Sequence, residues 1–291
     1  MNTAALGFAL GAAVLFAAGL VFTAIGLRHR SARRGAAVSI PTATALFVLA
    51  APFALDLSRF DWTAALIFAA AGLGYPALVT LLTFESARRV GPGIAGALGN
   101  LTPLFAVGFA AILLGETPRP GQAAGIAAIV AGVMLISFPG RLPGGARAAL
   151  GWAIALPLAA AALRGLIQPG VKAGLGIWPD AFAASAIGYI VSAAVVTGSA
   201  GFGGEPPAPA PRAAGRLWFG LIGLCNGFAV MALYFALNLA PVAFVSPIVA
   251  TYPLFTLLFG AIVLPRGQGP APRQIVGIVT TVSGVGLLLA L

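Results

Sequence analysis

The sequence predicts an all-α integral membrane protein in which ten transmembrane helices form two inverted five-helix repeats. The first observation is composition, because 60% of the 291 residues are hydrophobic and only 8% are charged. A soluble domain needs a larger charged surface than this. The second is that apolar segments of about 20 residues recur, the length that a helix needs to cross roughly 30 Å of hydrocarbon. The third is that one sequence pattern occurs twice.

The first repeat is expected over residues 1–139, and its first span over about 3–27. That span has no basic n-region and is longer than the apolar core of a signal peptide, so we expect it to be retained. A basic segment at 28–34 follows it. The next spans are expected at 36–55, at 62–85 with a kink at Pro76, at 93–114 and at 122–138.

A Pro- and Gly-rich linker is expected at residues 140–147, and the second repeat at 148–291. Its spans are expected at 148–173, 179–197, 215–237, 242–264 and 273–291. The two repeats are related by an internal duplication. Residues of the fourth and fifth spans return in the ninth and tenth at an offset of about 150 residues, with two extra residues in the second loop. The matched pairs are Pro103 and Pro253, Phe105 and Phe255, Gln122 and Gln274, Gly125 and Gly277, and Gly132 and Gly284.

Five crossings per repeat place the second copy upside down relative to the first, because an odd number of crossings delivers the chain to the opposite side. The loops after the odd-numbered spans contain twelve of the 16 Lys and Arg residues. The positive-inside rule therefore places these loops in the cytoplasm and both termini outside. Topology explains the net charge of +10 without a nucleic-acid partner. We expect a multi-pass protein of the cell membrane, specifically a bacterial inner membrane.

Catalytic and metal-binding patterns are missing from the sequence. The single histidine, His29, is in a loop, and the single cysteine, Cys225, is in an apolar segment. We therefore expect no enzyme activity, no cofactor and no metal site.

The duplicated Pro-Leu-Phe helix, Gly115-Glu116 before a Pro-containing loop, and the Gly-rich fifth and tenth helices resemble the EamA-type members of the drug/metabolite transporter superfamily. The resemblance implies ten helices and secondary transport. This sequence departs from the family pattern in three ways. The first helix lacks the common Trp-Gly pair, Pro265-Arg266 stands where the first repeat has Gly115-Glu116, and the charges place the termini outside rather than in the cytoplasm.

The sixth span contains the most informative polar residues. Arg164, Gln168 and Lys172 are four residues apart and so share one helix face. An intramembrane arginine is costly and usually faces a bundle interior or water. Arg164 either lines a cavity, where it favours a carboxylate or phosphate, or binds carbonyls that Pro169 frees.

Other polar residues of the spans are candidates for substrate binding or for hydrogen bonds between helices: Asn100, Thr102, Ser246, Tyr252, Asn226, Tyr234 and Tyr75. The prolines expected to mark gating or kink positions are Pro76, Pro103, Pro247 and Pro253. Glu85 is interpreted either as a helix-end ion pair with Arg88 or Arg89, or as a coupling carboxylate.

These features together predict a secondary transporter, not driven by ATP, that moves a small anionic or zwitterionic metabolite such as an amino acid by alternating access. A lipid or lipid-phosphate carrier and a non-transporting membrane scaffold are the alternatives. The expected partners are the lipid bilayer and the small-molecule substrate, for a monomer or homodimer.

Overall fold

The structure, a computed structural model, describes residues 2–29, 31–90, 92–137, 152–199, 212–263 and 271–290. Ten of its helices are long and apolar enough to cross a membrane, which confirms the ten expected spans. In the part of the chain described, regular structure is entirely helical. The expected linker at 140–147 and the Pro265-Arg266 pair lie outside the described residues.

The first five spans are built from these helices: α1 (Thr3–Gly26), α2 (Ala32–Ala54), α3 (Trp62–Gly72), the π-helical η1 (Leu73–Leu78), α4 (Val79–Val90), α5 (Pro92–Gly99), α6 (Thr102–Leu114) and α7 (Pro120–Ser137). The second five are built from these: η2 (Trp152–Ile154), α9 (Ala155–Ile177), α10 (Ala181–Ser199), α11 (Arg212–Leu239), α12 (Val242–Val249), α13 (Tyr252–Val263) and α14 (Pro272–Ala290). The third, fourth, sixth and ninth spans each contain more than one helical segment.

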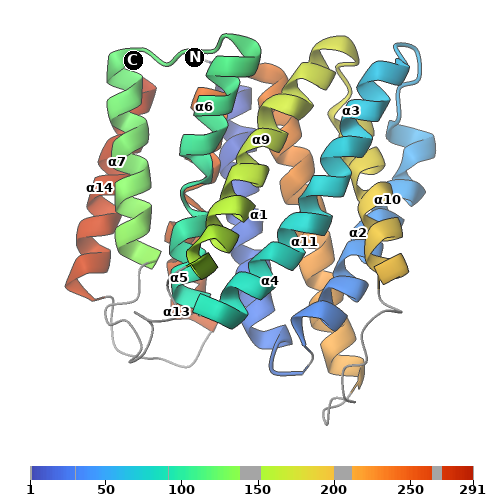
Figure 1. Cartoon of the computed structure of the whole chain (residues 1–291), viewed down its shortest axis with the longest axis horizontal. Coiled ribbons are helices and arrows are strands. Elements are labelled where there is room, and N and C mark those ends of the chain that lie inside the picture. Colours follow the sequence, from blue (N-terminus) through green and yellow to red (C-terminus); the bar gives the residue numbers. More distant parts are fainter. Residues whose placement is uncertain are drawn as a thin grey trace.

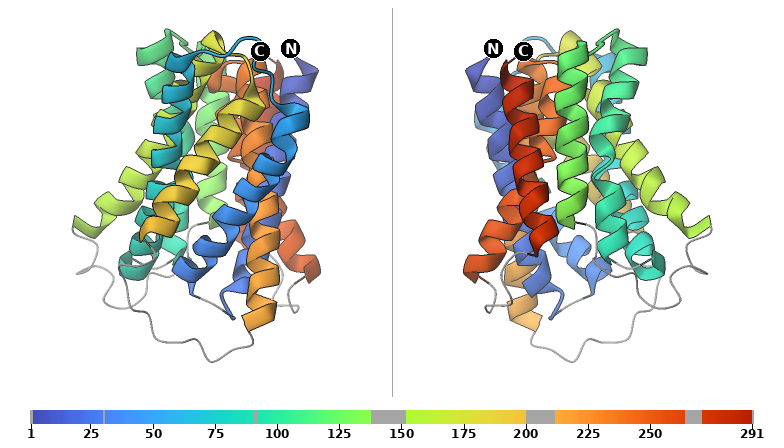
Figure 2. Two further views of the ribbon diagram at one scale, coloured as in Figure 1. Left: turned by 90° about the vertical axis from the view of Figure 1, so that its right-hand side faces the viewer. Right: turned by 90° about the vertical axis from the view of Figure 1, so that its left-hand side faces the viewer.

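Both chain termini lie at one end of the bundle, which we call the terminal face, and the helices splay toward the opposite end (Figures 1 and 2). We call that opposite end the loop face. It is where α1, α4, α7, α10 and α13 end. Helix α1 runs from the terminal face to the loop face, whereas α9, the first long helix of the second half, runs the other way. The two halves are therefore inverted copies.

The halves interlock rather than lying side by side. Helix α1 packs on α11, α12 and α13 of the second half, and α9 packs correspondingly on α3, α4, α5 and α6 of the first. Two further pairs, α2 with α10 and α7 with α14, join equivalent helices of the two halves. The pairing is what a twofold axis in the membrane plane produces.

Helices α7 and α14 meet backbone to backbone through glycines. A Cβ on Gly132 would lie 2.7 Å from the Gly277 oxygen, and a Cβ on Gly277 would lie 2.7 Å from the Gly132 oxygen. Small residues permit this approach in a membrane, where dispersion contacts rather than the hydrophobic effect hold helices together. The glycine spacing of the sequence thus has a packing cause.

The duplicated glutamines cap the same two helices. Gln122 Oε1 accepts the Arg119 N–H over 3.0 Å, and Gln274 Oε1 accepts the Ala271 N–H over 2.9 Å. In each case the side chain, three residues into the helix, satisfies a backbone donor left open at the helix start. The duplication therefore includes the way that each fifth helix begins.

The fourth and ninth spans are broken midway. Turns separate α5 from α6 and α12 from α13, and each second segment begins with a proline in its first turn, Pro103 or Pro253. A threonine closes each break, because Thr102 Oγ1 donates to the Gly99 oxygen and Thr251 Oγ1 to the Ile248 oxygen, both over 2.7 Å. Pro103 removes the backbone donor that the Gly99 oxygen would otherwise accept, and the Thr102 hydroxyl takes its place. The Ile248 oxygen also accepts the Thr251 N–H over 3.1 Å, so the Thr251 hydroxyl adds a second bond at the other break.

The third span bends at Tyr75, whose backbone (φ −138°, ψ 130°) is extended inside the π-helical segment that includes Pro76. Pro247 lies inside α12. The sixth span is longer than expected, because α9 continues to Ile177 rather than ending near residue 173. Lys172 lies within this helix, as expected, and protein groups compensate its charge, as described below.

Candidate substrate cavity

A cavity occupies the middle of the bundle and consists of three adjoining compartments. The central compartment has a volume of about 200 Å³, and the two others have volumes of about 260 and 340 Å³. Arg164 lines all three. The 260 Å³ compartment reaches Leu27, just beyond the end of α1, and Ala36, near the start of α2. The cavity therefore extends from mid-bundle to the loop face.

The structure brings all of the candidate substrate-binding residues together at the central compartment. They come from five spans: Arg164, Gln168, Asn100, Thr102, Tyr252, Ser246, Asn226, Tyr234 and Tyr75. Pro103 lines the same compartment, and Pro76 and Pro253 line the neighbouring ones. Pro247 is buried in α12 and lines none of the three.

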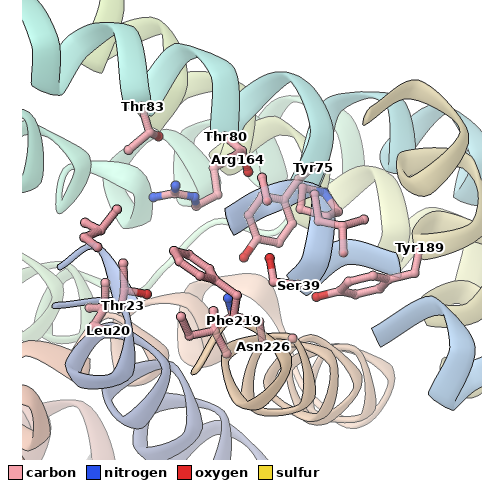
Figure 3. Close-up of a pocket in the computed structure, with 16 residues that line it drawn as sticks. Leu20, Thr23, Ser39, Tyr75, Thr80, Thr83, Arg164, Tyr189, Phe219 and Asn226 are labelled. Carbon is pink, nitrogen blue, oxygen red and sulfur yellow. The ribbon is translucent and has the colours of Figure 1, made fainter. Parts of the chain in front are cut away.

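Arg164 extends into the cavity from α9 beside Tyr75, with Thr23 and Asn226 facing it from other helices (Figure 3). Its Cζ atom lies 5.6 Å from the centre of the Tyr75 ring, within cation–π range. Over the described residues the guanidinium has no hydrogen bond to a carbonyl and no carboxylate partner, and no Asp or Glu lines the cavity. The surroundings of Arg164 thus favour the cavity-lining interpretation over the binding of freed carbonyls.

A chain of hydrogen bonds crosses the cavity wall at the helix breaks. The Tyr252 hydroxyl donates to Asn100 Oδ1 over 2.8 Å, and Asn100 Nδ2 donates to Ser137 Oγ over 2.8 Å. Asn100 is buried and lies in the turn between α5 and α6, two residues before α6 begins at Thr102. The chain ties the two broken spans to each other and to α7.

Two buried oxygens of the central compartment have no hydrogen-bond partner among the described residues, Gln168 Oε1 and Ser246 Oγ. Both residues also belong to the lining of that compartment. Buried polar atoms without a partner are uncommon and point to a function or a ligand.

Several lining residues escaped the sequence analysis because they carry little polar signal. Gly19 and Thr23 of α1 line the cavity, and a Cβ on Gly19 would lie 2.7 Å from Asn226 Oδ1. Gly19 therefore leaves the space that Asn226 occupies. Thr80 and Thr83 of α4 line the compartments nearer the loop face. Gly19 and Thr23 reach the site because α1 packs on α11, a contact that the sequence does not indicate.

The cavity ends toward the terminal face at a network that joins the two halves. Lys172 Nζ lies 3.5 Å from Glu116 Oε1 and donates to the Leu237 and Ala240 oxygens over 2.9 and 2.6 Å. Glu116 Oε2 accepts the Val242 N–H over 2.7 Å. The cation lies at the end of α11 and the carboxylate at the start of α12, the polarity that helix ends prefer.

This network, formed by Glu116, Lys172 and the backbone of residues 237–242, is about one helical turn thick. Three of its residues each lie four positions, or about one helical turn, from a residue that lines the central compartment: Lys172 from Gln168 on α9, Leu237 from Leu233 on α11 and Val242 from Ser246 on α12. A separate pocket of about 400 Å³ lies on its other side, against Glu116, Ala240 and Ala243. The network is thus a thin partition between two hollow regions.

Glu85 lies at the end of the third span and lines none of the three compartments. It forms an ion pair with Arg89, which also lies over the Trp152 ring at 4.4 Å. Both charged side chains are about one third exposed. Glu85 thus lies outside the cavity, in an ion pair at the end of its helix.

Comparison with known proteins agrees with this architecture. The model of the EamA-like transporter family matches residues 3–138 and 148–290, one half after the other. A crystal structure titled only as that of a protein superposes with a TM-score of 0.81 over 99% of this chain and 96% of the other, at 16% identity, and shows the same fold. A search of curated protein sequences finds no match. The chain belongs to the EamA-like transporter family and is a multi-pass membrane transporter.

Proposed function

We propose that the protein is a secondary transporter of a small metabolite with a carboxylate or phosphate, anionic or zwitterionic, which it moves by alternating access. The observation that carries the proposal is Arg164, a cation in mid-bundle with no carboxylate partner in the described structure. A partly buried charge without a partner in mid-bundle is costly, and an anionic substrate would supply the missing charge. Charge-assisted bidentate bonds to a carboxylate or phosphate suit a guanidinium.

Access to the cavity supports the mechanistic part of the proposal. The cavity reaches the loop face, and among the described residues the Glu116–Lys172 network lies between it and the pocket at the terminal face. Opening that network while closing the splayed end would expose Arg164 to the other side. The broken spans supply bending points beside the site, a common feature of inverted-repeat transporters.

The distribution of charge indicates which face of the bundle is cytoplasmic. Five arginines lie near the loop face, at the ends of helices that meet there: Arg28, Arg34, Arg89, Arg216 and Arg273. By the positive-inside rule this face is cytoplasmic, and the cavity then opens to the cytoplasm. A bacterial inner membrane, with both termini outside, is the location that we propose.

The test is cysteine labelling of full-length protein in oriented vesicles, in a Cys225→Ala background. Thr23→Cys and Thr102→Cys place thiols in the cavity, and Ile112→Cys, at a residue 78% exposed on the lipid-facing surface, is the control. We expect a small charged methanethiosulfonate to label both cavity thiols from the loop face, and a mixture of organic anions to slow that labelling. Unreactive cavity thiols beside a reactive His29→Cys would instead favour a packed scaffold.

A further inference from the structure

We propose that the substrate is a net anion that also carries an uncharged hydrogen-bonding group, and that Gln168 and Ser246 bind this second group. The inference rests on the proposed transport function and narrows it. In this proposal Arg164 binds the anionic end of the substrate, and Gln168 Oε1 and Ser246 Oγ, which have no partner among the described residues, bind the other end.

The missing partners are specific to these two residues. Gln168 is 6% exposed and Ser246 is 2% exposed. Other buried hydroxyls bond to a carbonyl of their own or a neighbouring helix, as Ser185 does to Ala181 and Ser192 to Gly72. A serine inside a helix commonly bonds back to the carbonyl four residues earlier, yet Ser246 does not. In the part of the chain that the structure describes, the fully buried side-chain atoms without a partner thus both belong to residues that line the central compartment.

The two groups lie beyond Arg164 along the cavity. Gln168 follows Arg164 by one turn of α9, about 6 Å toward the terminal face, and Ser246 lines the same compartment from α12. The volume of about 200 Å³ equals that of about seven liquid waters, which suits a small metabolite. A substrate whose anionic group meets Arg164 from the loop face would direct its other end at Gln168 and Ser246.

The charge of the cavity lining determines which chemical group fits at the substrate end near Gln168 and Ser246. Arg164 is the one charged residue among those described around the three compartments. An ammonium group at Gln168 would be buried near a guanidinium with no carboxylate to compensate it, which is unfavourable. A hydroxyl or amide can donate to Gln168 Oε1 and exchange a hydrogen bond with Ser246 Oγ at no such cost. The site thus prefers a hydroxylated or amidated acid to a zwitterionic amino acid.

The experiment measures binding of three matched probes to purified full-length protein by calorimetry: hexanoate, 6-hydroxyhexanoate and 6-aminohexanoate. All three have a carboxylate and differ only at the far end. We expect the hydroxy acid to bind about tenfold more tightly than hexanoate, since it satisfies buried groups that hexanoate leaves open. The amino compound should bind most weakly. Tighter binding of the amino compound than of the hydroxy compound would overturn the proposal.

Two variants locate the effect. Gln168→Leu and Ser246→Ala should each reduce the preference for the hydroxy acid toward that for hexanoate, with hexanoate itself bound within about twofold of wild type. Ser185→Ala, a buried serine outside the cavity, should leave the preference unchanged, and Gln168→Met replaces the leucine variant if that one is not monodisperse. A hydroxy-acid preference that survives both changes contradicts the inference.

Arg164→Met separates this inference from the function on which it rests. A roughly 10- to 100-fold loss of carboxylate affinity in that variant supports the anion site. If Arg164→Met binds the three probes as wild type does, or if wild type binds none of them, the proposed anion site itself is wrong. If Arg164→Met loses binding but Gln168 and Ser246 prove unimportant, only the second site is wrong.

Discussion

Tyr252 donates a hydrogen bond to Asn100 over 2.8 Å and so joins the two spans that are broken in the middle of the bundle. Tyr252 begins α13, and Asn100 lies in the turn before α6. Each comes from a different half of the chain. The bond therefore lies where the inverted copies meet, on the wall of the cavity.

Breaking this bond should cost stability. We expect Tyr252→Phe and Asn100→Leu to show a coupling of about 1 kcal/mol in a double-mutant cycle, the net value of one buried hydrogen bond. The measurement is the free energy of unfolding in detergent micelles. Tyr189→Phe, in which a buried ring packs on Phe47, is the control for removal of a tyrosine hydroxyl. Strictly additive effects would show that the bond contributes nothing.

Arg164 should control affinity for the anionic substrate. Replacement by Met removes a charged hydrogen-bonding partner, worth about 1.5–3 kcal/mol, so the apparent affinity for carboxylates should fall roughly 10- to 100-fold. The affinity of Arg164→Lys for carboxylates should lie between those of wild type and Arg164→Met, because lysine keeps the charge but loses the bidentate geometry. Transport of labelled carboxylates into proteoliposomes measures both. Equal transport by all three proteins would argue against an anion site.

The partition between the two hollow regions should respond to Lys172. Lys172→Met removes the cation that holds Glu116 and two carbonyls, so conformations open at the terminal face should become more populated. We expect labelling of Ser246→Cys from that face to rise about tenfold, as a shift of about 1.4 kcal/mol would produce. Arg119→Met, an exposed cation near the same face, is the matched control. Unchanged labelling would show that Lys172 has only a packing role.

The glycine contact of α7 with α14 should not tolerate a methyl group. A Cβ at Gly132 would lie 2.3 Å from Thr281 Oγ1, so Gly132→Ala should destabilise the protein by about 1–3 kcal/mol through overpacking. Gly286→Ala, also in this helix pair but with nothing within 4 Å, should be neutral or stabilising by up to about 1 kcal/mol. Thermal unfolding in detergent compares them. Similar melting temperatures would mean that the two helices can separate without cost.

Orientation can be tested with two loop residues. Cysteines are placed at His29, three residues after α1 ends at the loop face, and at Asp61, directly before α3 begins at the terminal face, each in a Cys225→Ala background. We expect an impermeant thiol reagent added to intact cells to label Asp61→Cys and not His29→Cys, since the basic loops should be cytoplasmic. The reverse pattern would place the termini in the cytoplasm and open the cavity to the outside.

Much of the architecture was predictable because the membrane restricts the chain to apolar helices of a fixed length. The shared face of Arg164 and Gln168 follows from periodicity within a single helix, and the inversion follows from five crossings per repeat. Contacts between the two halves do not follow from either, because they join residues far apart in the sequence. Glu116 and Lys172 are 56 positions apart in the sequence, and no periodicity links them.

Trp178 shows the same limit. Tryptophans near span ends typically lie in an interfacial belt, and Trp62 fits that rule because it is 75% exposed. Trp178 does not, because it is buried and donates through Nε1 to the Asp56 oxygen over 3.1 Å. Its position in the sequence is equivalent to that of the others, and only contact with the loop before α3 distinguishes it.

The interlocking of the two halves has a consequence for biosynthesis. Helix α1 leaves the ribosome before the other described helices, and its packing partners α11, α12 and α13 are synthesised about 200 residues later. At a synthesis rate of about 5–20 residues per second, α1 stays in the bilayer without these partners for tens of seconds. Helix α1 contains no charged residue, so it is stable as a separate, lipid-exposed helix during that time. Assembly of the cavity is therefore a late, post-insertion event.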